Sequence, residues 1–133
     1  TMQRPHMCIS KTENTASQWA AVAALNGDQS CVDEMVAAYR ERRDRVVELV
    51  ADAPHLTAYT PGGAFFITPS LPAGTDCFDV AMRMLTEARV CTVPGGAFGE
   101  SCRNSLRISF ATSMDIIENA FARMIPWLEK QSF

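Results

Sequence analysis

The sequence predicts an α+β fold, an α/β two-layer sandwich in which a small mixed or antiparallel sheet carries helices on one face. Apolar residues recur at three-and-four spacing in several segments, and short apolar runs bounded by proline and glycine lie between those segments. The composition is that of a globular protein, with 47% apolar and 20% charged residues. At 133 residues the chain is long enough to bury a core.

The N-terminal half is expected to hold two helices. Residues 19–25 form a short helix that stops at Asn26-Gly27. A second helix starts near Asp28 or Ser30, either of which can cap it, and ends before Pro54. It would span roughly 24 residues, or about 36 Å. Because that length exceeds what a domain of this size needs, we interpret it as a long N-terminal strut helix.

The C-terminal half is expected to alternate strands and helices. Short strands are predicted over residues 56–60, 64–68, 90–93 and 105–110. The turn Pro61-Gly62-Gly63 predicts a hairpin or a bulged strand entry. Asp76 or Thr75 caps a third helix, and Thr112 to Asp115 resembles a capping box that opens the last one. We expect an irregular arm over residues 1–14 and a single domain over 15–133.

Composition also excludes several classes of function. The net charge of −3 and the lack of a basic run argue against nucleic acid as a partner. No apolar stretch is long enough to cross a membrane, so no membrane partner is expected. Five widely spaced cysteines and two histidines fit reduced thiols and no metal site. A cytoplasmic protein is therefore expected.

One arginine, Arg107, stands inside the apolar run Leu106 to Ala111, shortly after the turn Val93 to Gly99. A guanidinium in a strand must keep water or find a fixed anion, and it can clamp a carboxylate with two hydrogen bonds. Taken alone, an arginine at such a position is more often an edge-strand residue or an ion-pair partner.

The loop before Arg107 is rich in glycine and contains one phenylalanine, Phe98. Gly95, Gly96 and Gly99 permit backbone angles that would let the loop fold tightly toward a ligand, although an ordinary turn has the same composition. The phenylalanines of these segments are most simply core residues, and one of them could touch a substrate; they are Phe65, Phe66, Phe98 and Phe110.

Five segments in order, at plausible spacing, resemble the C-terminal (small) domain of the class I and II pyridoxal-phosphate aminotransferases of fold type I, the group that includes aspartate aminotransferase. They are Thr15 to Ala21, Tyr39 to Asp44, Pro61 to Phe66, Val93 to Gly99 and Leu106 to Ala111. The resemblance implies that Arg107 grips the α-carboxylate of an amino-acid substrate. It also implies pyridoxal 5'-phosphate as cofactor, an amino acid and a 2-oxo acid as substrates, and a homodimer in the intact enzyme.

The resemblance further suggests that Thr12, Asn14 and Thr15 belong to a segment that reaches the cofactor phosphate or the substrate entrance of a neighbouring subunit. Short hydroxyl and amide side chains suit phosphate oxygens. Equally, these residues could be turn and cap residues before the first helix. Thr12 and Asn14 are therefore the candidate cofactor-binding residues, and both interpretations stay open.

No catalytic residue is expected within these 133 residues. Amino transfer needs a lysine that bonds to the cofactor, and only Lys11 and Lys130 are present, neither in the sequence context that the family uses. The Asp that pairs with the pyridine nitrogen and the aromatic that stacks on the ring should also lie upstream. The chain alone is thus expected to be inactive.

Two other functions are compatible with the same resemblance. Aminotransferase-like domains also occur as cofactor-sensing domains of transcription regulators, and some lyases use this scaffold. An upstream winged-helix segment would favour the regulator, and an upstream lysine motif the enzyme. The side-chain preference for the amino acid is not determined by these residues.

Overall fold

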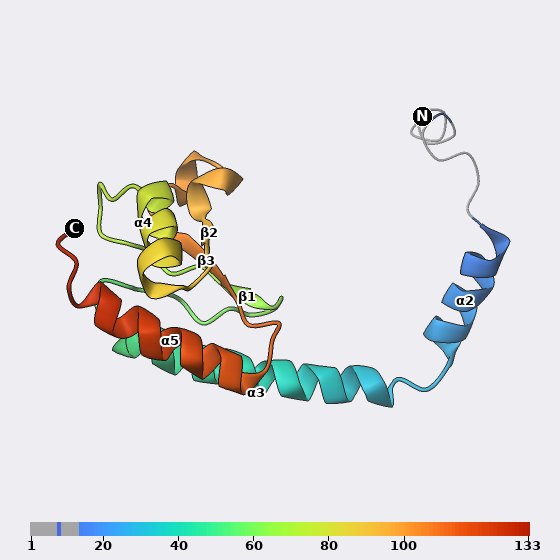
Figure 1. The fold of residues 1–133 in the computed structure, drawn as a ribbon. Helices are drawn as coiled ribbons and strands as arrows, with labels where there is room; N and C mark the ends of the chain where they lie inside the picture. The colour runs from blue at the N-terminus through green and yellow to red at the C-terminus, as the bar shows by residue number, and fades with distance from the viewer. Residues whose placement is uncertain (1–7, 9–13) are drawn as a thin grey trace. The chain divides into compact units, whose positions relative to one another are not determined.

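The computed structural model describes Cys8 and residues 14–133. The contacts divide the chain into two compact units, one over Thr1–Met35 and the other over Val36–Phe133. Figure 1 gives the order of the elements along the chain. The extent of a single domain over 15–133 stays a prediction.

The first unit contains helix α2, Thr15–Asn26, and the start of helix α3, Ser30–Asp52. Asn14 caps α2, because its Oδ1 accepts a hydrogen bond of 2.8 Å from the amide of Ala16. Gly27 ends the helix and donates its amide to the Ala23 carbonyl at 2.9 Å. Both predicted helices are confirmed, and α2 starts four residues earlier than expected.

The second unit contains the remainder of α3 and all of the sheet. Along the chain follow β1 (Phe66–Ile67), α4 (Cys77–Arg83), the π-helix η1 (Met84–Ala88), β2 (Val93–Pro94), the 3₁₀-helices η2 (Gly95–Phe98) and η3 (Glu100–Cys102), β3 (Leu106–Ser109) and α5 (Met114–Leu128). The strand order is β1-β3-β2, with both pairs antiparallel. The central strand β3 therefore carries the run around Arg107.

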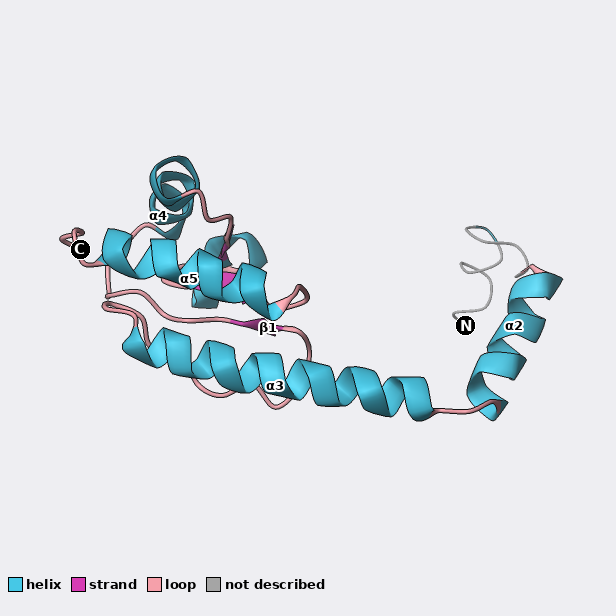
Figure 2. Cartoon of the chain, turned by 60° about the horizontal axis from the view of Figure 1, so that its bottom comes forward, coloured by secondary structure: helices cyan, strands magenta, loops and turns pink. Residues whose placement is uncertain are grey.

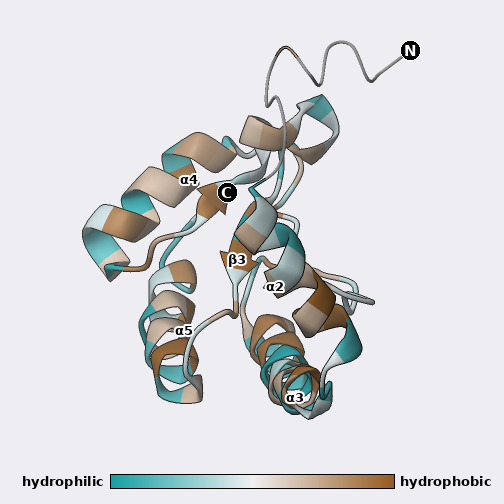
Figure 3. Cartoon of the chain, turned by 90° about the vertical axis from the view of Figure 1, so that its right-hand side faces the viewer, coloured by the Kyte–Doolittle hydropathy of each residue, from teal (hydrophilic) through white to brown (hydrophobic). Residues whose placement is uncertain are grey.

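Helices α3, α4 and α5 contribute to the single hydrophobic core of this unit. It holds Val46, Leu49 and Val50 of α3, Val80 and Ala81 of α4, Leu106 and Phe110 at the central strand, and Ile117, Phe121, Met124, Trp127 and Leu128 of α5. Figure 3 shows polar and apolar positions sharing the surface of α3 and α5, as expected for helices that bury one side. The α+β prediction, with a small antiparallel sheet, is confirmed.

Helix α5 runs alongside the part of α3 that belongs to this unit (Figure 2). The guanidinium of Arg45 in α3 pairs with the Glu118 carboxylate of α5 at 2.9 Å. The helix itself starts without the predicted capping box, because its N-cap is Ser113, whose side chain makes no cap hydrogen bond. That part of the prediction is wrong.

The sheet differs from the expectation in the length of its strands. They are shorter than predicted, and residues 56–60 contribute only one isolated bridge, between Thr57 and Ser70. The Pro61-Gly62-Gly63 turn leads into β1, which is one of the two predicted alternatives. Strand β1 then pairs with β3 through Phe66 opposite Ser109. None of the described helices combines the length and the apolar character that crossing a membrane requires.

Candidate anion-binding site

Arg107 lies on the face of the sheet opposite the core. Side chains alternate along a strand, and on one side of β3 Leu106 is fully buried while Ile108 packs against the core. Phe110, the next residue on that side, is only 1% exposed. Arg107 therefore points to the other face, where it is half-buried.

Two aromatic rings contact the Arg107 guanidinium. Its central carbon lies 4.3 Å from the centroid of the Phe98 ring and 5.2 Å from that of Phe66. Phe66 reaches it as a diagonal neighbour across the sheet, because Phe66 is paired with Ser109, two residues beyond Arg107. Phe98 comes from the glycine-rich loop. Both contacts are within the range of a cation–π interaction.

The hydrogen-bond donors of Arg107 have no acceptor among the residues that the structure describes. No described carboxylate pairs with it, whereas Arg45, Arg83 and Arg103 each pair with a glutamate. A cation–π contact is not a conventional hydrogen bond, so the rings do not supply the N–H groups with an acceptor. Within the described part of the chain, Arg107 can thus offer two parallel N–H groups to a planar anion.

The loop that carries Phe98 is fixed by close packing of its glycines. Gly95 donates its amide to the Ser105 carbonyl at 2.7 Å, and a Cβ at Gly95 would approach the Ser105 Oγ to 2.1 Å. A Cβ at Gly96 would approach the Phe78 ring to 2.8 Å. Of the three glycines in this loop, only Gly99 has a positive φ, of 133°. Close approach, rather than the predicted backbone freedom, therefore explains Gly95 and Gly96.

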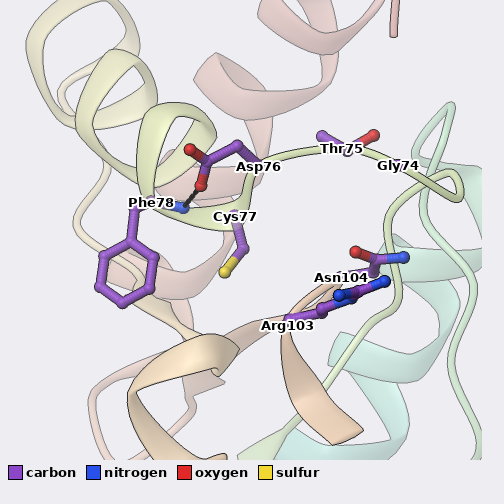
Figure 4. Close-up of a pocket in the computed structure, with 7 residues that line it drawn as sticks. All are labelled: Gly74, Thr75, Asp76, Cys77, Phe78, Arg103 and Asn104. Carbon is purple, nitrogen blue, oxygen red and sulfur yellow. Dashed lines mark hydrogen bonds between the residues drawn. The ribbon is translucent and has the colours of Figure 1, made fainter. Parts of the chain in front are cut away.

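The backbone of Gly96 also meets a buried thiol. Its amide donates to the Sγ of Cys77 at 3.4 Å, and Cys77 is 2% exposed. Cys77 also lines a cavity of about 290 Å³ at the start of α4 (Figure 4). The two charged side chains of that cavity already have partners, since Asp76 accepts the Phe78 amide at 2.9 Å and Arg103 pairs with Glu100 at 2.6 Å. The cavity therefore offers no free charge comparable to that of Arg107.

The two candidate cofactor-binding residues have different outcomes. Thr12 lies outside the described residues. Asn14 is described, and its side-chain oxygen caps α2. Asn14 belongs to the first unit and Arg107 to the second. A role of Asn14 toward a cofactor phosphate stays a prediction.

The described residues do not by themselves fit pyridoxal phosphate. They include one lysine, Lys130, which is exposed in the turn after α5. Lys11 lies outside the described residues. In the part of the chain that the structure describes, no three His, Cys, Asp or Glu side chains come together as a metal site. What these residues offer is a means of holding an anion.

Two of the residues at Arg107 were not expected there from the sequence. Phe66 and Phe98 were predicted as core residues, but Phe98 is 54% exposed and Phe66 is half-buried against Arg107. Phe65, also predicted in the core, is 51% exposed, and only Phe110 is buried. Phe66 lies on the arginine face because it pairs with Ser109, two residues beyond Arg107, and no single segment of the sequence signals that register.

The second unit is a two-layer α+β domain. It carries an arginine on the open face of its central strand, beside a glycine-rich loop, and known proteins share this class of domain. The family model for aminotransferase class I and II matches residues 2–124. The chain therefore belongs to the class I and II aminotransferase family.

Individual relatives agree with this assignment. An aspartate aminotransferase of Bacillus sp. (strain YM-2) is 37% identical over 118 residues, which are 83% of this chain and 29% of that protein. A probable aspartate aminotransferase of Methanocaldococcus jannaschii is 40% identical over 106 residues, which are 80% of this chain and 28% of that protein. The chain thus spans less than a third of the length of these curated relatives.

Solved structures of the family share the fold. An aromatic aminotransferase from Pyrococcus horikoshii OT3 superposes with a TM-score of 0.89 and 34% identity, covering 96% of this chain and 35% of that one. An aspartate aminotransferase from Rhizobium meliloti superposes with a TM-score of 0.87 and 30% identity, covering 98% of this chain and 35% of that one.

Proposed function

We propose that this chain is the C-terminal substrate-carboxylate-binding domain of a pyridoxal-phosphate-dependent aminotransferase, and that it is inactive alone. The parent enzyme would move an amino group from an amino acid to a 2-oxo acid. The observation that carries the proposal is the state of Arg107, which is half-buried, in contact with two aromatic rings and without a described acceptor for its N–H groups.

A carboxylate is the anion that fits this arrangement best. It is planar, and its two oxygens match two parallel N–H groups of one guanidinium. Every amino acid and every 2-oxo acid carries a carboxylate next to the reacting carbon. Holding that group fixes the position of the neighbouring carbon, which lowers the entropic cost of the chemical step. Arg107 would therefore bind both substrates of the reaction in turn.

We extend the proposal to the cofactor, the partners and the cellular location of the parent enzyme, which membership of the family supports. Pyridoxal 5'-phosphate would act as the electron sink for the reaction, on a lysine outside the residues that this chain supplies. The parent would be a cytoplasmic homodimer with small-molecule substrates and no nucleic-acid or membrane partner. Thr12 and Asn14 would approach the cofactor phosphate or the substrate entrance of the neighbouring subunit.

The named relatives favour an aminotransferase over the two alternatives. The proteins of Bacillus sp. (strain YM-2), Pyrococcus horikoshii and Rhizobium meliloti are all described as aminotransferases, and none of these three as a regulator or a lyase. No observation at Arg107 favours cofactor sensing, because a carboxylate clamp acts on the substrate. The aminotransferase is therefore the proposed function.

The test compares the 133-residue chain with the full-length protein that contains it. The full-length protein, supplied with pyridoxal phosphate, is assayed for amino transfer from a panel of amino acids to 2-oxoglutarate. We expect transfer by the full-length protein and none by the chain. After borohydride reduction, mass spectrometry should find no cofactor on the chain. Stoichiometric cofactor on Lys11 in an active sample of the chain would refute the proposal.

A further inference from the structure

We infer that Phe98 and Phe66 are positioning residues that hold the Arg107 guanidinium in the orientation in which it binds a carboxylate. The inference rests on the proposed function and adds to it two residues whose role is not to bind the substrate but to orient the group that does. It starts from the two ring contacts, at 4.3 Å from Phe98 and 5.2 Å from Phe66.

An arginine side chain without such contacts would lose its preferred direction. Its four rotatable bonds carry substantial rotamer entropy, and fixing them on binding costs affinity. Salt bridges usually fix an arginine, but no described carboxylate pairs with Arg107. The rings supply the fixing contact instead. Because they leave the charge uncompensated, the guanidinium keeps its full attraction for an incoming anion.

The position of Phe98 is itself determined by the loop beneath it. Gly95 is anchored to Ser105 through a 2.7 Å hydrogen bond, and Gly96 donates to the Cys77 sulfur at 3.4 Å. Both glycines pack too closely for a side chain. A ring that is 54% exposed is thus held by its backbone rather than by burial. This is the arrangement expected for a side chain that serves a site and not the core.

Phe66 is fixed by the sheet in a different way. Its strand pairs with β3 in a register that puts Phe66 opposite Ser109 and Ile67 opposite Ile108. Arg107 and Phe66 therefore share the open face as diagonal neighbours, within reach of a long side chain. The two rings come from separate segments, so each substitution tests one contact while leaving the other in place.

The first experiment uses the full-length protein, selectively labelled at arginine, and NMR. Ring currents should shift the side-chain resonances of Arg107 away from their values in an unstructured peptide. Phe98→Leu should return these resonances toward the peptide values, and Phe98→Tyr should keep them shifted, because tyrosine retains the ring. Unchanged Arg107 resonances in Phe98→Leu, with the fold intact by its other resonances, would overturn the inference.

The second experiment uses the full-length enzyme and steady-state kinetics. A cation–π contact contributes enough that Phe98→Leu should lower kcat/KM about 2- to 30-fold. The change should fall mainly on KM and should raise the inhibition constant of acetate in parallel, since both report how well a carboxylate is held. Phe66→Leu should also lower kcat/KM. Phe98→Tyr keeps an aromatic ring, so its kcat/KM should stay close to that of the wild type. The control is Tyr59→Leu, because the Tyr59 side chain is 97% exposed.

The outcomes separate this inference from the proposed function. If Arg107→Ala is impaired while the leucine variants of Phe98 and Phe66 match the control, the positioning role is wrong and the carboxylate clamp stands. If Arg107→Ala is also unimpaired, the proposed function fails as well. A loss confined to kcat, with KM and acetate inhibition unchanged, would also contradict positioning.

Discussion

The indole N–H of Trp127 in α5 donates a hydrogen bond of 2.7 Å to the carboxylate of Glu87 in the π-helix η1. The Arg83 guanidinium lies 3.4 Å from the other oxygen of the same carboxylate and 5.6 Å from the Trp127 ring. Both contacts hold the pKa of Glu87 below its ordinary value. The indole hydrogen bond has the larger effect and Arg83 the smaller one. These side chains link the last helix, α5, to the π-helix η1 that follows α4.

The first prediction is a pH dependence of stability from Glu87. Because its pKa is lower in the folded chain than in the unfolded one, the ionised carboxylate stabilises the fold above the unfolded pKa. That contribution is lost as the pH falls through the folded pKa. Glu87→Gln should therefore lower the free energy of unfolding at pH 7, and the difference from wild type should shrink toward zero on acidification. Urea denaturation at stepwise lower pH measures this.

The control variant is Glu129→Gln, which replaces an exposed carboxylate just after α5. Its difference from wild type should be small across the same pH range. A Glu87→Gln difference that stays constant, or grows, as the pH falls would show that the indole hydrogen bond does not favour the ionised form.

The second prediction concerns the glycine loop. A Cβ at Gly95 would lie 2.1 Å from the Ser105 Oγ and 2.3 Å from the Cys102 carbonyl oxygen, so Gly95→Ala forces the loop to move. We expect a loss of stability of about 1–3 kcal/mol, as for overpacked sites. Gly62→Ala is the matched control, since nothing lies within 4 Å of its Cβ position, and its change should be within about 0.5 kcal/mol. Equal denaturation midpoints for the two variants would contradict this.

The third prediction concerns the first unit. No residue of α2 is buried, and two of its large apolar side chains are strongly exposed, Trp19 at 70% and Leu25 at 81%. A helix of 12 residues is marginal in water without packing. The isolated chain should therefore self-associate through these side chains, with helicity that rises with concentration. Light scattering and circular dichroism of wild type and Leu25→Lys would measure it, and a wild type that stays monomeric at high concentration would count against it.

The helices were the part of the fold that the sequence predicted best, because their signals are local. The three-and-four spacing of Val46, Val47 and Val50, with Pro54 beyond, places the end of α3 within two residues of Asp52. The π-helix after α4 has no comparable signal. Its hydrogen bonds reach one residue further than those of an α-helix, and no residue pattern in Met84–Ala88 marks that change.

The sheet and the site were predicted only in part, because they depend on partners far apart in the sequence. Arg107 stood out as a charge in an apolar strand, which is a local signal. Its contacts with Phe66 and Phe98 depend on the register of β1 with β3 and on the packing of Gly95. Neither is encoded in a single segment, so both aromatic residues were assigned to the core by their apolar character alone.

The last prediction concerns Arg107 in the parent enzyme. If its guanidinium makes two charge-assisted hydrogen bonds to the α-carboxylate, Arg107→Lys loses the bidentate geometry and keeps the charge, whereas Arg107→Ala loses both. At roughly 1.5–3 kcal/mol for each bond, the alanine variant should lose about two to four orders of magnitude in kcat/KM, with lysine intermediate. Cofactor binding and folding should survive, because the arginine acts on the substrate.

The size of this defect should not depend on the substrate side chain, since every amino acid carries the same α-carboxylate. Steady-state kinetics with two chemically dissimilar amino acids, such as aspartate and phenylalanine, would measure it. A loss confined to one of them would make Arg107 a side-chain-selecting residue, and near-normal turnover by Arg107→Ala would make it structural. An equal loss on both, with the cofactor retained, is the result that a carboxylate clamp requires.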